Sequence, residues 1–194
     1  GKNANIKDSS VNINGGTIDG NVYGGGYAGT SDTTSVIIDN SDGKKVVIGN
    51  SVFGGGEGIT ATVYTSSTVD IDLDFIFTAL ESEVSVTSGE TSGEIKTNIT
   101  YDSNQSVIKG SVYGGGDLGQ VGVGVIDLGS NSASISKVGT TKVVINNGHI
   151  EGSVFGAGNG VPSEGVTYKV EMGAIFGKTS ATVYGGYIEG NLYG

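Results

Sequence analysis

Hydrophobic and polar residues alternate in short runs along this chain, and the runs end at glycines. In the first unit, Val11 and Ile13 alternate with polar residues, which is the period of a half-buried strand. A glycine pair interrupts this run, and a second short strand passes through Ile18 and Val22 before three consecutive glycines. The pattern predicts a strand, a turn, a second strand and a glycine corner.

The same order of residues returns along the chain. It is clearest at 142–158 and 181–194, and it is looser at 36–56, where Asp42-Gly43 between two apolar runs predicts a turn. Five copies of an aliphatic-aromatic pair followed by glycine mark the corners: Val22-Tyr23, Val52-Phe53, Val112-Tyr113, Val154-Phe155 and Leu192-Tyr193. The aliphatic residues stand 30, 60, 42 and 38 residues apart. Because 60 is twice 30, we expect a unit of about 30 residues, with one motif lost within 62–99 and loops lengthening the later units.

This repetition predicts an all-β fold, a β-solenoid or β-helix of irregular turns with glycine corners. Strands of successive turns would lie about 4.8 Å apart, so the five aliphatic residues would form one ladder and the five aromatic residues an adjacent one. We expect the aliphatic ladder inside, since neighbouring residues of a strand point to opposite faces. The corner glycines, which allow sharp turns or close backbone approach, are Gly24, Gly25, Gly26, Gly54, Gly55, Gly56, Gly114, Gly115, Gly116, Gly156 and Gly158.

Two other arrangements fit the same pattern. The units could form antiparallel hairpins stacked in a sandwich or prism, or their strands could pair between chains in a fibre. For the solenoid we expect a single repetitive domain over 1–194, with an atypical, insertion-like stretch at about 62–100.

Composition removes several classes of fold. The chain has 37 glycines but a single proline, Pro162, and no Gly-X-Y period, which excludes collagen. Interior glycines and a high Val, Ile, Thr and Tyr content disfavour helices. There is no cysteine and no apolar run long enough for a transmembrane helix, and we expect no signal peptide within these residues. The chain begins at Gly1 within repeat-like sequence, which suggests a processed or excised piece of something longer.

Charge narrows the choice of partners. The formal net charge is −10, and all ten basic residues are lysines. An acidic chain without arginine is repelled by polyanions and lacks bidentate phosphate contacts, so nucleic acid and anionic membrane surfaces are poor partners.

Few residues suggest chemistry. No helix is predicted after any glycine triplet, so the triplets are corners and not phosphate-binding loops. Asp70, Asp72 and Asp74 resemble the opening of a calcium loop, but they alternate with apolar residues on one strand face, so they are weak calcium candidates and a solvated acidic face is expected. His149 occupies the position of Thr17 and Tyr187 in sister units, which predicts a surface strand position.

Two further sets of residues bear on carbohydrate chemistry. Asp19, Glu151 and Glu189 share one repeat position, so stacking would align carboxylates of the kind that polysaccharide-cleaving solenoids use. Their recurrence as part of the repeat favours a structural role, and we expect no catalytic residue and no cofactor. Tyrosines expected at the surface can stack on sugar rings or cover strands: Tyr27, Tyr64, Tyr101, Tyr168 and Tyr187.

The units GGTIDGNVYGGG, NGHIEGSVFGAG and GGYIEGNLYG resemble the glycine-rich repeats of large surface or secreted proteins of gut bacteria, which look like adhesins or cell-surface fibres with β-solenoid character. The resemblance covers about a third of the chain and not 62–99. It implies an extracellular, non-enzymatic bacterial protein and transfers no catalytic residues.

These observations give two hypotheses for the function. The first is a structural protein, either an adhesin segment joined to further repeats of its parent chain or a subunit of a filament. In the filament, Tyr193-Gly194 of one copy followed by Gly1-Lys2 of the next restores a shortened glycine corner. The second is a carbohydrate-binding or carbohydrate-cleaving module, as in a spike, with host or bacterial glycans as ligands.

Overall fold

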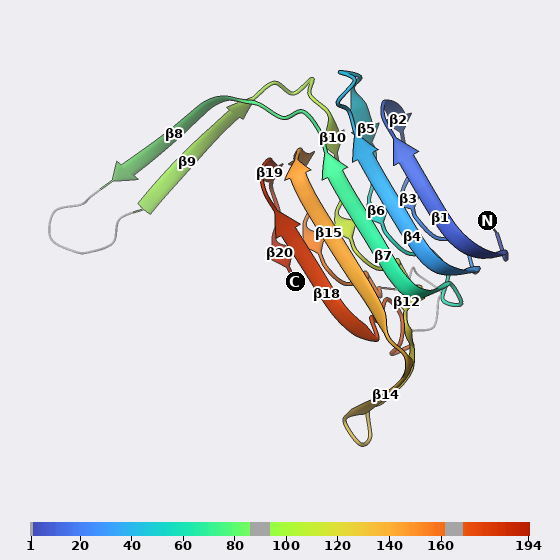
Figure 1. Ribbon diagram of the computed structural model, residues 1–194. Helices are drawn as coiled ribbons and strands as arrows, with labels where there is room; N and C mark the ends of the chain where they lie inside the picture. Colours follow the sequence, from blue (N-terminus) through green and yellow to red (C-terminus); the bar gives the residue numbers. More distant parts are fainter. Residues whose placement is uncertain (1, 86–93, 162–168) are drawn as a thin grey trace, which may run out of the picture.

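The chain is all-β in its computed structural model, which describes residues 2–85, 94–161 and 169–194 and contains no helix within them. Most strands belong to three parallel sheets (Figure 1). The first sheet contains, in spatial order, β1 (Asn5–Ile13), β4 (Thr30–Asp39), β7 (Thr62–Asp72), β15 (Gly139–Asn147) and β18 (Gly177–Val183), with β12 (Gln120–Val121) also paired to β7.

The other two sheets are built from much shorter strands. The second contains β2 (Gly16–Ile18), β5 (Val46–Ile48), β10 (Val107–Ile108), β16 (His149–Ile150) and β19 (Tyr187–Ile188). The third contains β3 (Val22–Tyr23), β6 (Val52–Phe53), β11 (Val112–Tyr113), β17 (Val154–Phe155) and β20 (Leu192–Tyr193). Over the described residues the chain therefore makes five passes, and each pass runs through the three sheets in the same order. The fourth pass supplies two strands to the first sheet, since β12 and β15 both pair with β7.

The passes are stacked in register. Val22 lies opposite Val52, Val52 opposite Val112, Val112 opposite Val154, and Val154 opposite Leu192, each pair between parallel strands. The strand-turn-strand units therefore do not fold back on themselves as antiparallel hairpins. Each of their strands pairs instead with the equivalent strand of the next pass.

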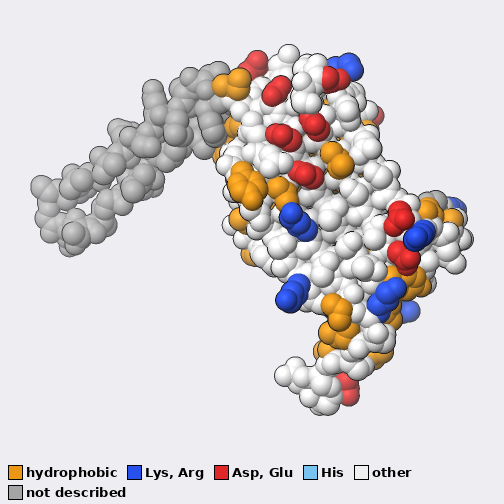
Figure 2. Space-filling model, viewed as in Figure 1, with side chains coloured by type: hydrophobic (Ala, Val, Ile, Leu, Met, Phe, Trp, Pro, Cys, Tyr) orange, Lys and Arg blue, Asp and Glu red, His pale blue; other side chains and the backbone are white. Residues whose placement is uncertain are grey.

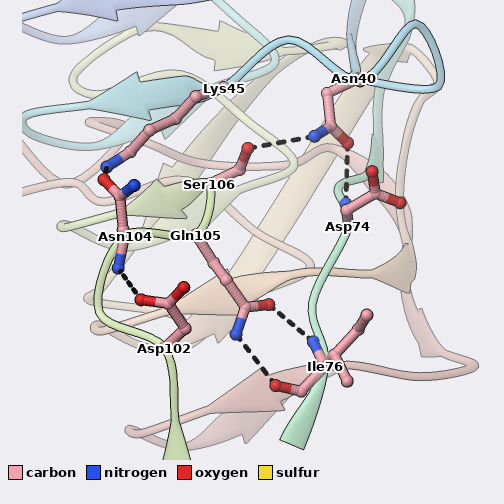
Figure 3. A pocket seen from close by; sticks show the side chains of 9 residues that line it. Asn40, Lys45, Asp74, Ile76, Asp102, Asn104, Gln105 and Ser106 are labelled. Carbon is pink, nitrogen blue, oxygen red and sulfur yellow. Dashed lines mark hydrogen bonds between the residues drawn. The ribbon is translucent and has the colours of Figure 1, made fainter.

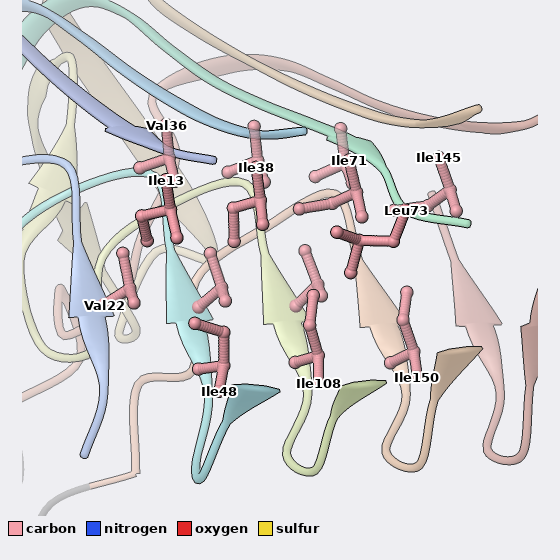
Figure 4. Packing of buried hydrophobic residues seen from close by; sticks show 14 of the residues in the cluster. Ile13, Val22, Val36, Ile38, Ile48, Ile71, Leu73, Ile108, Ile145 and Ile150 are labelled. Atoms are coloured by element: carbon pink, nitrogen blue, oxygen red, sulfur yellow. The ribbon is translucent and has the colours of Figure 1, made fainter. Parts of the chain in front are cut away.

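The core lies between the three sheets, where each contributes aliphatic side chains (Figure 4). The long strands of the first sheet alternate buried and exposed residues, so Val36 and Ile38 are buried beside exposed Ile37. Ile48, Ile108 and Ile150 of the second sheet are completely buried, as are the central valines of the third. Burying a Val or Ile side chain stabilises the fold by roughly 1.5 to 3 kcal/mol, so the buried aliphatic residues that recur in each pass are the main source of stability.

The glycine corners allow neighbouring passes to approach closely. Their φ angles lie outside the left-handed region, so no corner glycine is needed for a positive φ, although the chain bends at these positions. A Cβ on Gly55 would instead lie 2.7 Å from the backbone nitrogen of Gly116 in the next pass. Inward-pointing hydroxyls fix the corners from inside: Ser67 Oγ donates to the carbonyl of Gly114 at 2.6 Å, and Thr141 Oγ1 donates to that of Gly156 at 2.5 Å.

The expectation that one motif has been lost within 62–99 is wrong. β6 pairs directly with β11, so no pass lies between them and the interval of 60 residues belongs to a single pass. The extra length forms an antiparallel hairpin of β8 (Phe77–Ser85) and β9 (Glu94–Tyr101), inserted between β7 and β10 (Figure 1). A second antiparallel hairpin, β13 (Val123–Asp127) with β14 (Ser132–Lys137), lengthens the next interval.

Candidate functional site

The outer side of the third sheet carries an aromatic column. The rings of Tyr23, Phe53, Tyr113, Phe155 and Tyr193 stack in that order, with centroids 4.8 to 5.0 Å apart and planes within 9° of parallel. Phe53 is only 3% exposed, whereas Tyr193 in the last pass is 49% exposed. Burial raises the pKa of Tyr23 to about 12, and the carboxylates of Glu57 and Asp117 add to this effect.

A second column, of polar side chains, runs beside the aromatic one. Asn21 Oδ1 accepts a hydrogen bond from the backbone N–H of Ser51 at 2.9 Å. The serine at the same position in each later pass repeats this contact with the pass that follows: Ser51 Oγ with Ser111 N–H, Ser111 Oγ with Ser153 N–H, and Ser153 Oγ with Asn191 N–H, at 2.9 to 3.1 Å. Asn or Ser at this motif position therefore has a defined role, to link adjacent passes.

The two ends of the stack differ in how much apolar surface they present. In the first pass, Ile13 and Val22 are 8% and 5% exposed. In the last pass, the equivalent residues Val183 and Leu192 are 37% and 50% exposed. The last pass thus leaves part of the hydrophobic core uncovered.

The prediction that His149 occupies a surface position is wrong, although its alignment with Tyr187 is correct. The side chain of His149 is 4% exposed because Phe75, just after β7, packs over it with ring centroids 5.4 Å apart. Its Nε2 lies 2.7 Å from Glu189 Oε1, and its ring stacks on that of Tyr187. Sequence periodicity could not reveal this covering residue, because Phe75 belongs to the atypical stretch.

The predicted acidic face is present at the carboxyl ends of β4 and β7, at the top of the view in Figure 2. Asp70, Asp72 and Asp74 are exposed and alternate with buried apolar residues. Partial burial raises the pKa of Asp72, and the charges of Asp39, Asp70 and Asp74 raise it further. No group of three or more His, Cys, Asp or Glu side chains within residues 2–85, 94–161 and 169–194 has an arrangement that could hold a metal ion.

The repeat-position carboxylates are not all adjacent. Glu151 and Glu189 lie in neighbouring passes, because their backbone N–H groups donate to Ile108 and Ile150 respectively. Asp19 is separated from them by two passes, in which Gly49 and Lys109 occupy the same position.

The expected surface tyrosines lie in different settings. Tyr27 is 50% exposed, with Lys2 Nζ 5.7 Å from its ring centroid, and Lys137 Nζ lies 4.5 Å from the ring centroid of Tyr64. Tyr187 stacks on His149. Tyr168 and the side chain of Tyr101 lie outside the described residues.

Sequence reasoning missed a pocket of about 390 Å³ between three connections of the chain (Figure 3). The connections are β4–β5, with Asn40 and Lys45; β7–β8, with Asp74 and Ile76; and β9–β10, with Asp102 to Ser106. The only sequence signal was the group of polar turn residues at 40–45 and 102–106, which is typical of ordinary loops as well.

No helix that is long and apolar enough to cross a membrane is found in the part of the chain that the structure describes. A scan against protein-family models and searches of curated proteins and of solved structures found no match to this chain.

Proposed function

We propose that this chain is part of a β-solenoid with a structural role outside the bacterial cell, either as an adhesin segment or as a filament subunit, and that it is not an enzyme. The observation that supports this most is the parallel stacking of five passes through three sheets, with equivalent residues of the motif side by side. Such a stack is extended by adding one more pass of the same kind, from the same polypeptide or from a second copy. The resemblance of the glycine-rich units to surface repeats supports the location.

The hydrogen-bonding groups of the two ends are complementary. Inside the stack, the N–H of Val22 donates to the carbonyl of Ser51, and that of Val154 to the carbonyl of Asn191. By the same rule, a copy placed after the last pass would receive the Leu192 N–H at its own Asn21 carbonyl. Its Asn21 N–H would donate to Asn191 Oδ1, which continues the polar column.

The apolar surfaces of the two ends are complementary as well. In the same register, the exposed Leu192 and Val183 would pack against Val22 and Ile13 of the added copy, and Tyr193 would stack on its Tyr23. Parallel strand edges with a repeated side-chain pattern on both sides favour a head-to-tail contact, and such a contact does not close on itself. The product of repeated addition is a fibre.

Electron microscopy and solution scattering of the purified chain at increasing concentration test this proposal. We expect rods that lengthen with concentration, and shorter rods for Leu192→Asp, because a buried, unpaired carboxylate at the joint is costly. Leu128→Asp is the matched control, since Leu128 is 73% exposed in the connection between β13 and β14, which supplies no strand to the three stacked sheets. Monodisperse short particles for the unmodified chain at all concentrations would exclude self-assembly.

A further inference from the structure

The pocket at the base of the β8–β9 hairpin is an open cavity between connections that are hydrogen-bonded to one another (Figure 3). Its floor contains Asn40 and Ser106, each only 4% exposed. Asn40 Nδ2 donates to Ser106 Oγ at 3.1 Å, and Asn40 Oδ1 accepts from the backbone N–H of Asp74 at 2.7 Å. One buried amide thus joins all three connections that form the pocket.

The rim is held in the same way. Gln105 makes two hydrogen bonds to the backbone of Ile76, accepting from its N–H at 2.6 Å and donating to its carbonyl at 2.9 Å. Lys45 Nζ donates to Asn104 Oδ1 at 2.8 Å, and Asp102 Oδ1 accepts from the N–H of Asn104. These bonds join the connections around the pocket before a ligand binds, which lowers the cost of ordering them on binding.

The lining selects a class of ligand. Asp74 and Asp102 supply carboxylate acceptors, while Lys45 and the amides supply donors. Ile76, which is 70% exposed, adds an apolar wall. Anionic ligands are disfavoured because the lining contains two carboxylates and one lysine, and because Asp72 of the acidic face is close enough to Asp74 for their charges to interact.

These features fit a neutral molecule that carries several hydroxyl groups around an apolar ring face. We propose that the pocket binds one sugar residue of a glycan, with its hydroxyls on Asp74 and Asp102 and its C–H face against Ile76. A volume of about 390 Å³ lies near the lower end of the range of small-molecule pockets, roughly 300 to 1,000 Å³, which suits a ligand of this size. This proposal is independent of the structural role, because the pocket lies within a single subunit.

Binding of a panel of neutral methyl glycosides, measured by saturation-transfer NMR and titration calorimetry on the whole chain, tests the proposal. We expect at least one glycoside to bind. Asp74→Ala should weaken that binding at least tenfold, and Asp19→Ala, an exposed carboxylate in the turn between β2 and β3, should not change it. The side chain of Asp74 has no hydrogen bond among those that hold the walls, so this variant keeps the fold.

A second pair of variants separates ligand contact from loop structure. Asp102→Asn retains an acceptor for the Asn104 N–H and should still weaken binding, because a neutral amide is the weaker acceptor for a hydroxyl. Asp127→Asn, in an equivalent turn that caps Gly129 on the β13–β14 hairpin, is its control. Absence of binding across the panel, or binding that survives both pocket variants, would overturn the proposal. Leu192→Asp should bind the glycoside as tightly as the unmodified chain does. Its binding therefore distinguishes a loss of assembly from a loss of sugar binding.

Discussion

Replacing Gly55 with alanine tests whether the glycine corners exist for close approach of neighbouring passes. The new Cβ would lie 2.7 Å from Gly116 N, 2.9 Å from Gly116 Cα and 3.1 Å from Gly115 C, whereas ordinary contact begins at 3.4 Å. All three neighbours are backbone atoms of the adjacent pass, so no side chain can move aside. Relief requires the two passes to separate by about 0.7 Å, the difference between 3.4 and 2.7 Å.

That separation weakens specific contacts. The hydrogen bond from Gly55 N–H to Gly115 O, now 3.1 Å long, would be lost, and the one from Gly54 N–H to Tyr113 O would lengthen from 2.9 Å. Each is worth about 1 kcal/mol, and overpacking adds roughly 1 to 3 kcal/mol. Alanine stabilises by about 0.4 to 1 kcal/mol through the unfolded state. We therefore expect a net loss of roughly 1 to 3 kcal/mol in the free energy of unfolding.

Urea unfolding followed by far-ultraviolet circular dichroism measures this loss. Gly20→Ala is the matched control, because a Cβ on Gly20 has no atom within 4 Å and its φ lies outside the left-handed region. That variant should be unchanged or slightly more stable. Equal stability of the Gly55 and Gly20 variants would refute the close-approach explanation.

Four further changes have definite expected outcomes. Ile108→Ala removes a completely buried side chain and should lower the free energy of unfolding in urea by roughly 2 to 4 kcal/mol. Ile188→Ala, at the half-buried equivalent position in the last pass, should lower it clearly less. Equal losses would contradict the difference in burial between these two positions. Ser67→Ala leaves the Gly114 carbonyl without its inner donor and should cost about 1 to 2 kcal/mol, against no measurable effect for exposed Ser10→Ala. The pKa of Tyr23 is raised, so the folded state keeps the phenol proton to a higher pH than the unfolded state does. The free energy of unfolding should therefore fall as the pH rises from 10 to about 12. Tyr23→Phe should make this fall smaller in denaturation curves measured at a series of pH values. The raised pKa of Asp72 means that its negative charge destabilises the folded state near neutral pH, so Asp72→Asn should stabilise the fold by roughly 0.3 to 0.5 kcal/mol after solvent screening. This gain should shrink as the pH falls through the raised pKa. A loss of stability at pH 7 would contradict the repulsion between these carboxylates.

The parallel pairing of the strands could be predicted because each copy of the motif has the same types of residue at equivalent positions. An aliphatic residue, an aromatic residue and glycine at fixed spacing can satisfy burial, stacking and close approach together only if equivalent residues lie side by side. Val52 and Val112 are such a pair, although they stand 60 positions apart in the sequence. The spacing of the motifs led to the wrong prediction of a lost motif, because residue spacing does not distinguish a missing pass from a hairpin inserted into one pass.

The burial of His149 and the pocket could not be predicted for a related reason. Both depend on connections that occur once, near Phe75 and between Asp102 and Ser106, and a residue that occurs once has no sister copy for comparison. Their structure arises from long-range contacts such as Asn40 with Ser106, which are 66 residues apart. Periodicity carries no information about contacts of that kind.

The direct pairing of β6 with β11 shows that the number of residues in the chain does not determine the height of the stack of passes. Each pass advances the stack by one strand spacing, about 4.8 Å, whether it uses 30 residues or 60. Hairpins such as β8–β9 and β13–β14 are side branches that add surface without adding height. Sequence can therefore be gained or lost in these branches while the axial repeat stays constant, and the number of glycine corners, not the number of residues, sets the height.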